Sequence, residues 1–495
     1  MSVTASQRAL LPWATLLDSV QTFALLPDWL VGAIQSEQVR SALTRSIPEF
    51  ASGTLTLQDC RAKHVRLSDD GTGWTGSYYC TIADPAAGQR RIVLLLGRLI
   101  PPHQAAPDQS RTPVPFGSAG WRWYVPELHV AFEMQPSDTQ LTALSQLTDS
   151  EQARALLEQS IPRHAPASHE LHIESCRSEV LRYHPGLRCT IGYHLTYPSN
   201  LATRHHWPTF VVAKTYEGKK GQNAYDSMQA LWDSPLGTSG AVTIAEPLAY
   251  IPELKLLVQG PIHEEQTLQT LIGAALRAQT AEALADLDDY MRKTAVGLAE
   301  LHSTGVSIGD THRWEDELTE VRTFAQRLTV AIPDLAGAAA QLCTCLESLA
   351  SASPPDPQVP THGTFRPAQV LLDRGRIGFI DFDSFCQAEP AMDLALFMVA
   401  TIDIGMSVLC IEEHQATDPA LDSYHMGLLT QLETIANRFL AHYAALRPVA
   451  RQRVVVWAAL NMMELIVRCW ERVKPVRLNH IMLMLEHHLR VHLAE

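Results

Sequence analysis

One stretch in the second half of the 495-residue chain, residues 361–393, constrains the fold most strongly. It reads THGTFRPAQVLL, then GFIDFDS and EPAMDLA, with a short polar turn between the first two parts. The apolar runs Gln369–Leu372 and Ile377–Ile380 flank that turn, so they predict two short strands. A carboxylate, Asp381, ends the second strand. Phosphoryl transfer needs carboxylates that hold Mg²⁺, a cation on the phosphates and a group that orients the attacking hydroxyl, and this layout is typical of such a site.

The bulk composition limits the partners and the compartment. The net charge of −14 argues against nonspecific binding to nucleic acid or to anionic membranes, since both need a basic surface. The nine cysteines are odd in number and lack metal-ligand spacing, which favours reduced thiols in a cytoplasmic protein. The start lacks a basic signal-peptide region, and the apolar run Ala395–Ile411 contains Asp403 and Gly405. That run is predicted to be a buried helix, so we expect neither a membrane nor a nucleic-acid partner.

An internal repeat precedes the 361–393 stretch. Ser36–Arg40 (SEQVR) recurs as Ser150–Arg154 (SEQAR), and an offset of 116 aligns Leu94–Arg98 with Phe210–Lys214. The repeat predicts a duplicated unit of roughly 65–80 residues, well above a solenoid period. Each copy is predicted to contain a helix followed by strands.

The segments around these copies give the predicted architecture. Residues 101–120 and 351–360 are rich in Pro, Ser and Gly and are predicted to be a linker and a loop. Beyond Pro261 the apolar spacing is helical. We therefore predict an α+β protein with an antiparallel strand-rich amino lobe and a helical carboxy lobe, preceded by a duplicate of the amino lobe. The predicted ranges are 1–110 for the duplicate, 111–149 for a linker, 150–260 for the amino lobe and 261–495 for the carboxy lobe.

Three places match the parts of a phosphoryl-transfer site in the expected order. Lys214 lies near the end of the predicted strand Phe210–Tyr216, the loop His362–Gln369 follows much later, and Asp381 comes last. Taken alone, Lys214 is equally well a solvated strand-end lysine, and Asp381 a helix-capping or turn aspartate. Their combination with the repeat favours the functional interpretation.

These residues together resemble the aminoglycoside phosphotransferase and protein-kinase-like superfamily, from about Ser160 to the carboxy terminus. Leu181–Cys189, with Gly186 at its turn, is similar to the phosphate-covering hairpin of small-molecule kinases in that group. The resemblance implies that Lys214 binds phosphate and that Leu256–Gly260 is a hinge that holds adenine. Within that hinge, Val258 and Gly260 are the predicted nucleotide contacts.

The same resemblance assigns roles in the second half of the chain. Asp381 would bind Mg²⁺, and Asp393 would be the structural aspartate that follows the metal loop. Arg366 would touch the transferring phosphate, and His362 belongs to the same catalytic loop. ATP and Mg²⁺ are therefore the implied cofactors, with a small hydroxylated molecule as the substrate.

The departures from the family pattern concern activity. Thr364 stands where the family has the catalytic aspartate, and Gln369 stands where it has the second metal-binding asparagine. The predicted helix after Lys214 contains no glutamate, which leaves Asp226 as a shorter candidate partner for that lysine. Asp383 is a partial substitute for the missing base or, more simply, an ordinary polar loop residue.

The first copy is more degenerate. Arg98 occupies the position of Lys214, Asp69-Asp70-Gly71 lies near the hairpin turn, and no catalytic segment follows. A packing role or a protein partner is the expectation for this copy.

Three functional hypotheses remain. The first is a kinase-fold phosphotransferase that uses Mg²⁺-ATP on a small hydroxylated molecule, weakly because of Thr364. The second is a pseudokinase that binds nucleotide or a protein partner without catalysis. The third is a carrier of a non-nucleotide ligand. The sequence does not name the substrate, because the acidic residues of the carboxy lobe cannot be placed from it.

Overall fold

The computed structural model describes the chain in two compact units. The described residues are 21–85, 88–105, 114–118, 120–134, 143–161, 172–184, 188–198, 207–216, 218–351, 353–409 and 419–492. The first unit comprises Met1–Ser137, Glu315–Ala352 and Ala459–Glu495, and the second comprises Asp138–Trp314 and Ser353–Ala458. The predicted α+β class, with antiparallel sheets and a helical carboxy-terminal part, is confirmed. The predicted domain boundaries stay predictions.

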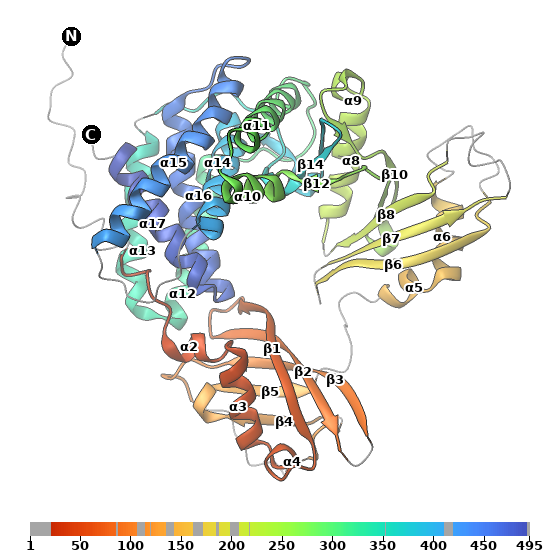
Figure 1. Cartoon of the computed structure of the whole chain (residues 1–495), viewed down its shortest axis with the longest axis vertical. Helices are drawn as coiled ribbons and strands as arrows, with labels where there is room; N and C mark the ends of the chain where they lie inside the picture. Colours follow the sequence, from red (N-terminus) through yellow and green to blue (C-terminus); the bar gives the residue numbers. More distant parts are fainter. Residues whose placement is uncertain are drawn as a thin grey trace. The chain divides into compact units, whose positions relative to one another are not determined.

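The first unit contains a five-stranded antiparallel sheet in the order β1-β2-β3-β5-β4. Tyr78 and Leu95 pair directly across β2 and β3 and are fully buried, so they define the inner face of this sheet. Helix α3 lies along the sheet (Figure 1). The strands are β1 (Thr56–Leu67), β2 (Trp74–Asp84), β3 (Gln89–Leu99), β4 (Arg122–Val125) and β5 (Val130–Met134), and the helices before them are α2 (Asp28–Gly32), α3 (Ser36–Ser46) and α4 (Pro48–Ala51).

Strands β4 and β5 correct one expectation. Both fall in residues 111–149, which the sequence predicts to be a linker, yet both belong to the first sheet. A tight turn at Pro126–Leu128 joins them, and His129 closes it with φ of 54°. The turn brings Val125 opposite Val130, so the hairpin extends the sheet by two short strands.

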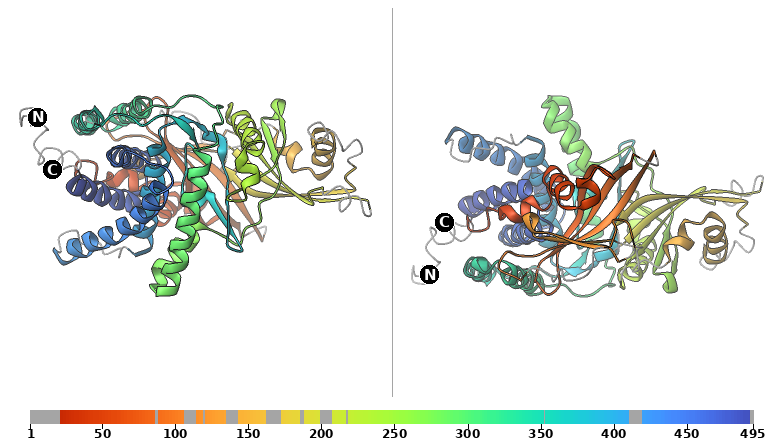
Figure 2. Two further views of the ribbon diagram at one scale, coloured as in Figure 1. Left: turned by 90° about the horizontal axis from the view of Figure 1, so that it is seen from above. Right: turned by 90° about the horizontal axis from the view of Figure 1, so that it is seen from below.

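The second unit contains another five-stranded antiparallel sheet, in the order β6-β7-β8-β11-β10 when read from its β6 edge. Helices α5 and α6 lie together on one side of this sheet (Figures 1 and 2). The predicted strand Phe210–Tyr216 is confirmed to the residue as β8. The other elements are α5 (Leu144–Thr148), α6 (Ser150–Ser160), β6 (Ser175–His184), β7 (Arg188–Thr196), α8 (Lys220–Trp232), α9 (Pro235–Ser239), β10 (Pro247–Ile251) and β11 (Leu256–Gln259).

The two sheets share more than strand order. The segment Tyr124–Leu128 (YVPEL) and the segment Tyr250–Leu254 (YIPEL) occupy the same hairpin in each sheet. Tyr78 donates its hydroxyl to the Ala33 carbonyl at 2.8 Å, and Tyr193 donates to the Leu147 carbonyl at 2.7 Å. In both cases the acceptor lies shortly before an 11-residue helix, α3 in the first unit and α6 in the second. These features support the predicted duplication, which remains a prediction.

In the first unit, the β1–β2 turn is docked on helix α12. Arg327 of α12 donates to the carbonyls of Leu67 at 3.3 Å and Ser68 at 3.0 Å. Gly71 has φ of +70°, and a Cβ there would lie 2.4 Å from the Arg327 carbonyl oxygen. The turn that carries Asp69 therefore packs against α12 within the first unit. The helices of this unit are α12 (Trp314–Ala331), α13 (Ala336–Ser351), the second part of α16 (Arg451–Arg472) and α17 (Pro475–His492).

In the second unit, helices and short strands follow the sheet. The predicted strands around the turn at residues 373–376 are confirmed as β14 and β15, each within a residue of its expected start. Helix α14 is apolar, and 61% of its most apolar window is buried inside the structure. By length and composition it is the one helix among the described residues that could span a membrane, which alone is weak evidence. The elements are β9 (Thr243–Ile244), β12 (Gln266–Thr267), α10 (Leu268–Ala278), α11 (Ala281–Leu301), β13 (Val359–Thr361), β14 (Val370–Asp373), β15 (Arg376–Phe379), β16 (Cys386–Ala388), α14 (Pro390–Leu409) and α15 (Pro419–Ala444).

The docked turn gives a stability prediction. Gly71→Ala places a methyl group against the α12 backbone and also imposes left-handed backbone on a residue with a side chain. We expect a loss of about 2–4 kcal/mol, from roughly 1 kcal/mol of backbone strain and about 1–3 kcal/mol of overpacking. Calorimetry of the intact protein should show a lower Tm for the first unit.

Gly88→Ala is the matched control. Gly88 lies in the β2–β3 turn with φ of +62° and has no neighbouring atom within 4 Å of a built Cβ. This variant therefore has the backbone strain without the collision. Equal losses of Tm in the two variants would show that α12 does not constrain the β1–β2 turn.

Candidate functional site

Lys214 and Asp381 meet in the second unit. Lys214 lies on β8 and Asp381 follows β15, and their side chains form an ion pair in which both are largely buried, with 15% and 28% exposure. Asp381 has φ of 71°, a left-handed conformation that turns the chain sharply after the strand. Burial alone would raise the pKa of the Asp381 carboxyl, but the positive charge of Lys214, aided by Arg188 and His362, lowers it. The carboxylate is therefore charged at neutral pH.

Three further side chains share this electrostatic environment. Arg188, at the start of β7, helps to lower the pKa of Asp381. Burial raises the pKa of Tyr216, two residues after Lys214, and the charges of Asp383 and Asp381 raise it further. The site thus holds two cations and two carboxylates around one neutral phenol. Sequence reasoning missed Arg188, although it lies beside the turn that was assigned to phosphate.

The loop before β14 is fixed by one carboxylate, Asp393, in the first turn of α14. Its Oδ2 accepts the His362 backbone N–H at 2.7 Å, and its Oδ1 accepts the Gly363 N–H at 2.9 Å. The ring of His302, at the end of α11, donates from Nε2 to Oδ2 at 3.1 Å, and its Nδ1 accepts from the Tyr443 hydroxyl at 2.8 Å. His302 and Asp393 are fully buried, so this network supplies the hydrogen bonds that a buried charge needs.

The loop also packs tightly against the metal-loop backbone. Gly363 has φ of +81°, and a Cβ there would lie 2.0 Å from the Ser384 carbonyl oxygen, so only glycine fits. The buried ring of His362 contacts the Ile380 carbonyl oxygen at 2.9 Å. His362 was predicted to be catalytic. Its burial and this contact favour a positioning role that joins the catalytic loop to the strand before Asp381.

Thr364 and Gln369 are hydrogen-bonded to each other. The Gln369 amide donates from Nε2 to Thr364 Oγ1 at 3.3 Å, and its Oε1 accepts the Arg366 backbone N–H at 3.0 Å. Gln369 is therefore engaged at both ends of its amide, and its role as a metal ligand stays a prediction. Arg366 itself is exposed, as a group that meets a substrate phosphate needs to be.

Helix α8 meets the metal loop through a residue that sequence reasoning did not single out. Asn223 donates from Nδ2 to the carbonyls of Asp383 at 3.2 Å and Phe385 at 3.1 Å. Asp226, the candidate partner of Lys214, instead accepts from Gln222 at 2.8 Å, so the structure gives Lys214 a different partner. The family pattern places a glutamate on this helix, and here the residue that meets the loop is the amide Asn223. An amide fits because α8 meets backbone carbonyls, which accept hydrogen bonds from an amide and repel a carboxylate.

The predicted hinge lies on a central strand. Val258 of β11, between β8 and β10, is fully buried in the core of the sheet, and its role as a nucleotide contact stays a prediction. Gly260 follows the strand, and its N–H donates to the Glu246 carbonyl at 2.8 Å. Gly186, the turn residue of the phosphate hairpin, lies outside the described residues.

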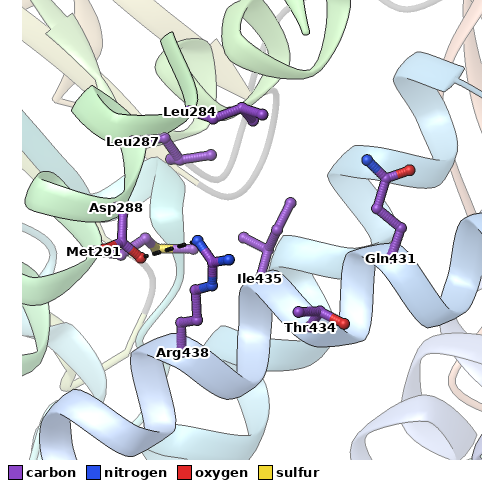
Figure 3. Close-up of a pocket in the computed structure, with 8 residues that line it drawn as sticks. All are labelled: Leu284, Leu287, Asp288, Met291, Gln431, Thr434, Ile435 and Arg438. Carbon is purple, nitrogen blue, oxygen red and sulfur yellow. Dashed lines mark ion pairs between the residues drawn. The ribbon is translucent and has the colours of Figure 1, made fainter. Parts of the chain in front are cut away.

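A separate cavity of about 190 Å³ lies between α11 and α15 of the second unit. Figure 3 shows Asp288 and Arg438 facing each other across it, with an ion-pair distance of 3.7 Å. Its apolar side chains include Leu287 and Met291. None of the predicted site residues lines this cavity, so it is distinct from the Lys214 and Asp381 site.

The donors present at the site suit Mg²⁺. This ion prefers carboxylate, carbonyl and water oxygens and is held by one or two carboxylates in phosphate-handling sites. Asp381 and Asp383 provide two carboxylates two residues apart, and both act electrostatically on Tyr216. In this chain Asp383 is a better second candidate than Gln369, whose amide oxygen already accepts a hydrogen bond.

The His302 network predicts a pH dependence. Burial lowers the pKa of His302 below its ordinary value of 6.5, while Asp393 opposes that effect. The unfolded chain takes up a proton near pH 6.5 and the folded chain resists it, so stability falls as pH drops below about 6.5, by up to about 1.4 kcal/mol per pH unit.

The matched variant is His302→Gln, which keeps a donor for Asp393 and an acceptor for Tyr443 but does not titrate. The other histidines are the same in both proteins, so the difference in Tm isolates His302. The advantage of the wild type should shrink between pH 7.5 and 5.5. Parallel Tm curves would mean that the pKa of His302 is the same in the folded and unfolded chains, which would contradict the expectation.

Residues 238–426 match the model of the phosphotransferase enzyme family. No curated protein matches the chain. Among solved structures, a glucosamine kinase is similar over 95% of this chain and 98% of its own, with 14% identity and a TM-score of 0.41. A choline kinase from Streptococcus pneumoniae is similar over 64% and 91%, with 15% identity and a TM-score of 0.39.

A thermostable mutant of an aminoglycoside phosphotransferase, without ligand, is similar over 68% of this chain and all of its own, with 13% identity and a TM-score of 0.43. The matched residues 238–426 include the loop anchored by Asp393 and the carboxylate of Asp381. The family model confirms the resemblance to the aminoglycoside phosphotransferase and protein-kinase-like superfamily over residues 238–426.

Proposed function

We propose that the second unit binds Mg²⁺-ATP and transfers the γ-phosphate to a hydroxyl of a small molecule, slowly. The observation that carries the proposal is the ion pair between Lys214 and Asp381, next to a loop that Asp393 holds in place. A phosphate-binding cation and a metal-binding carboxylate meet there although they are 167 residues apart in sequence. The transition state of phosphoryl transfer is loose and highly charged, so positioning and charge are the main contributions that a protein can make.

Each residue has a separate task in this proposal. Lys214 and Arg188 place positive charge on the phosphates, and Asp381 with Asp383 holds the metal. When bound, Mg²⁺ neutralises charge on the phosphate oxygens. Arg366 is exposed on the loop, and in this proposal its guanidinium meets the transferring phosphate. Thr364 faces the hydroxyl of the acceptor without being able to take its proton at neutral pH.

A second candidate, nucleotide binding without catalysis, is favoured by the bond between Gln369 and Thr364. That bond occupies the hydroxyl that would replace the missing base and the amide that would hold a second metal ion. A positioned general base is worth about 10²–10⁴ in rate, so its loss separates a slow enzyme from a binder. Both candidates predict nucleotide binding, and they differ in turnover.

Nucleotide binding is tested by thermal shift with Mg²⁺-ATP. At about a hundred times Kd we expect the wild type to gain roughly 5 °C in Tm. Lys214→Ala should lose this gain. Lys255→Ala, in the exposed β10–β11 turn, is the matched lysine control and should keep it. Asp381→Asn should abolish the dependence on Mg²⁺. A wild type that shows no shift would overturn both candidates.

Transfer is tested by restoring the base. Thr364→Asp should raise ATP-dependent phosphorylation of a panel of sugars, amino sugars and amino alcohols by about 10²–10⁴ over the wild type. Thr364→Asn is the matched control, since it has nearly the same shape and no basic carboxylate. Measurable wild-type turnover supports the slow enzyme, and turnover confined to Thr364→Asp supports the binder. Equal rates in the Asp and Asn variants would refute the assignment of position 364.

A further inference from the structure

The outer face of the first sheet is basic. Residues that pair directly across antiparallel strands lie on the same face, and Arg98 pairs with Thr75, Leu96 with Ser77 and Leu94 with Tyr79. This face is opposite to the inner face of Tyr78 and Leu95. Six cations project from it, and we call it the basic face: Arg61, Lys63, Arg66, Arg90, Arg98 and Arg122.

The carboxylates on this face do not balance those cations. Asp59 pairs with Arg61 at 2.8 Å, and Glu133 pairs with Arg122 at 3.4 Å. Four positive charges remain in excess among the described residues of the five strands, in a chain whose net charge is −14. Such a local concentration of positive charge, on a chain whose net charge is negative, indicates a surface that binds negatively charged groups.

An exposed apolar stripe crosses the same face. Ile92 is 71% exposed, and Leu94 and Leu96 continue the stripe along β3 as half-buried residues. The ammonium of Lys63 lies 5.3 Å from the centre of the Tyr79 ring, so an aromatic side chain adjoins the stripe. Cations around aliphatic and aromatic side chains match the composition of protein-binding surfaces, where arginine and tyrosine are enriched.

The second sheet has a face that corresponds to the basic face, and a cation stands at the matching position. Arg98 pairs with Ala131 of β5, as Lys214 pairs with Leu257 of β11. In the second sheet this face carries the lysine that meets Asp381. In the first sheet the chain continues from β5 to α5, and no catalytic segment lies between them in the sequence. Arg98 therefore has no counterpart of Asp381 following it before the second sheet begins.

We infer that the basic face docks an acidic segment of a partner protein. Its carboxylates would meet the arginines, and its apolar side chains would cover Ile92, Leu94 and Leu96. A nucleic acid fits less well, because the stripe is mainly aliphatic, with Tyr79 beside it, and because the net charge of the chain repels a long polyanion. A short acidic segment experiences mainly the local charge, since salt screens charges beyond roughly 10 Å.

The test uses the full chain and fluorescence anisotropy at low salt with three labelled probes. These are a glutamate–tyrosine copolymer, polyglutamate and a single-stranded oligonucleotide. The wild type should bind the copolymer most tightly, and added salt should weaken binding. The double variant Arg66→Glu/Arg98→Glu should bind the copolymer about tenfold more weakly.

Controls separate the face from general charge. Arg374→Glu/Arg376→Glu changes the same net charge in the exposed β14–β15 turn and should bind as the wild type does. Ile92→Ser should reduce the preference for the copolymer over polyglutamate. An unchanged Tm and an unchanged Mg²⁺-ATP shift in these variants would show that folding and the nucleotide site are intact.

Three outcomes would overturn the inference. The two double variants could bind the copolymer equally, which would mean that the basic face is not the binding surface. The oligonucleotide could bind most tightly, which would assign the face to nucleic acid. Sedimentation could show a dimer that dissociates in Arg66→Glu/Arg98→Glu, which would assign it to a second copy of this chain.

Discussion

The carboxylate of Asp393 is the interaction on which the candidate site depends. It accepts two successive backbone N–H groups, from His362 and Gly363, and a third hydrogen bond from His302. A buried charge with three donors is stable, whereas the same charge with its partners removed is costly. Because the carboxylate sits at the start of α14 and its ring partner ends α11, the loop is tied to two core helices. Its position is therefore set by the core of the second unit and does not require a ligand.

This arrangement separates the shape of the loop from its chemistry. Asp393 and Gly363 hold the loop through contacts with the backbone. Asp393 accepts two backbone N–H groups, and Gly363 packs against the Ser384 carbonyl. Thr364 projects from the loop, and its only described hydrogen bond is with Gln369. Under the proposed function, a change at position 364 would leave the anchored loop in place and alter proton transfer. The rate would then fall by the contribution of a general base, about 10²–10⁴, while the loop keeps its geometry.

Local patterns predicted much of the fold. The strand Phe210–Tyr216 and the turn around Gly375 follow from short-range spacing and appear as expected. The β4–β5 hairpin was missed, although the repeated YVPEL and YIPEL segments are visible in the sequence. They lie at an offset of 126, whereas the aligned strands before them lie at 116, so a search at one constant spacing does not find them.

The site was predicted less completely, for a different reason. Lys214 and Asp381 belong to recognisable motifs, but Arg188, Asn223 and His302 act through contacts made across long stretches of chain. Nothing in the sequence around Asn223 shows that its amide meets the Asp383 carbonyl, 160 residues later. Such contacts depend on where α8 and α11 pack. The spacing of apolar residues predicts which face of a helix is buried, but it does not predict which element that face packs against.

The two sheets show how one strand arrangement supports different tasks. Both place a cation at corresponding positions of their third strand, Arg98 in one and Lys214 in the other. In the second sheet the cation is largely buried and paired with a carboxylate that follows in the same unit. In the first it is exposed among other cations, and the neighbouring turn is held by Arg327 of α12. Under the two proposals, the charge that each cation faces, and not the sheet itself, would distinguish a nucleotide site from a surface for an acidic partner.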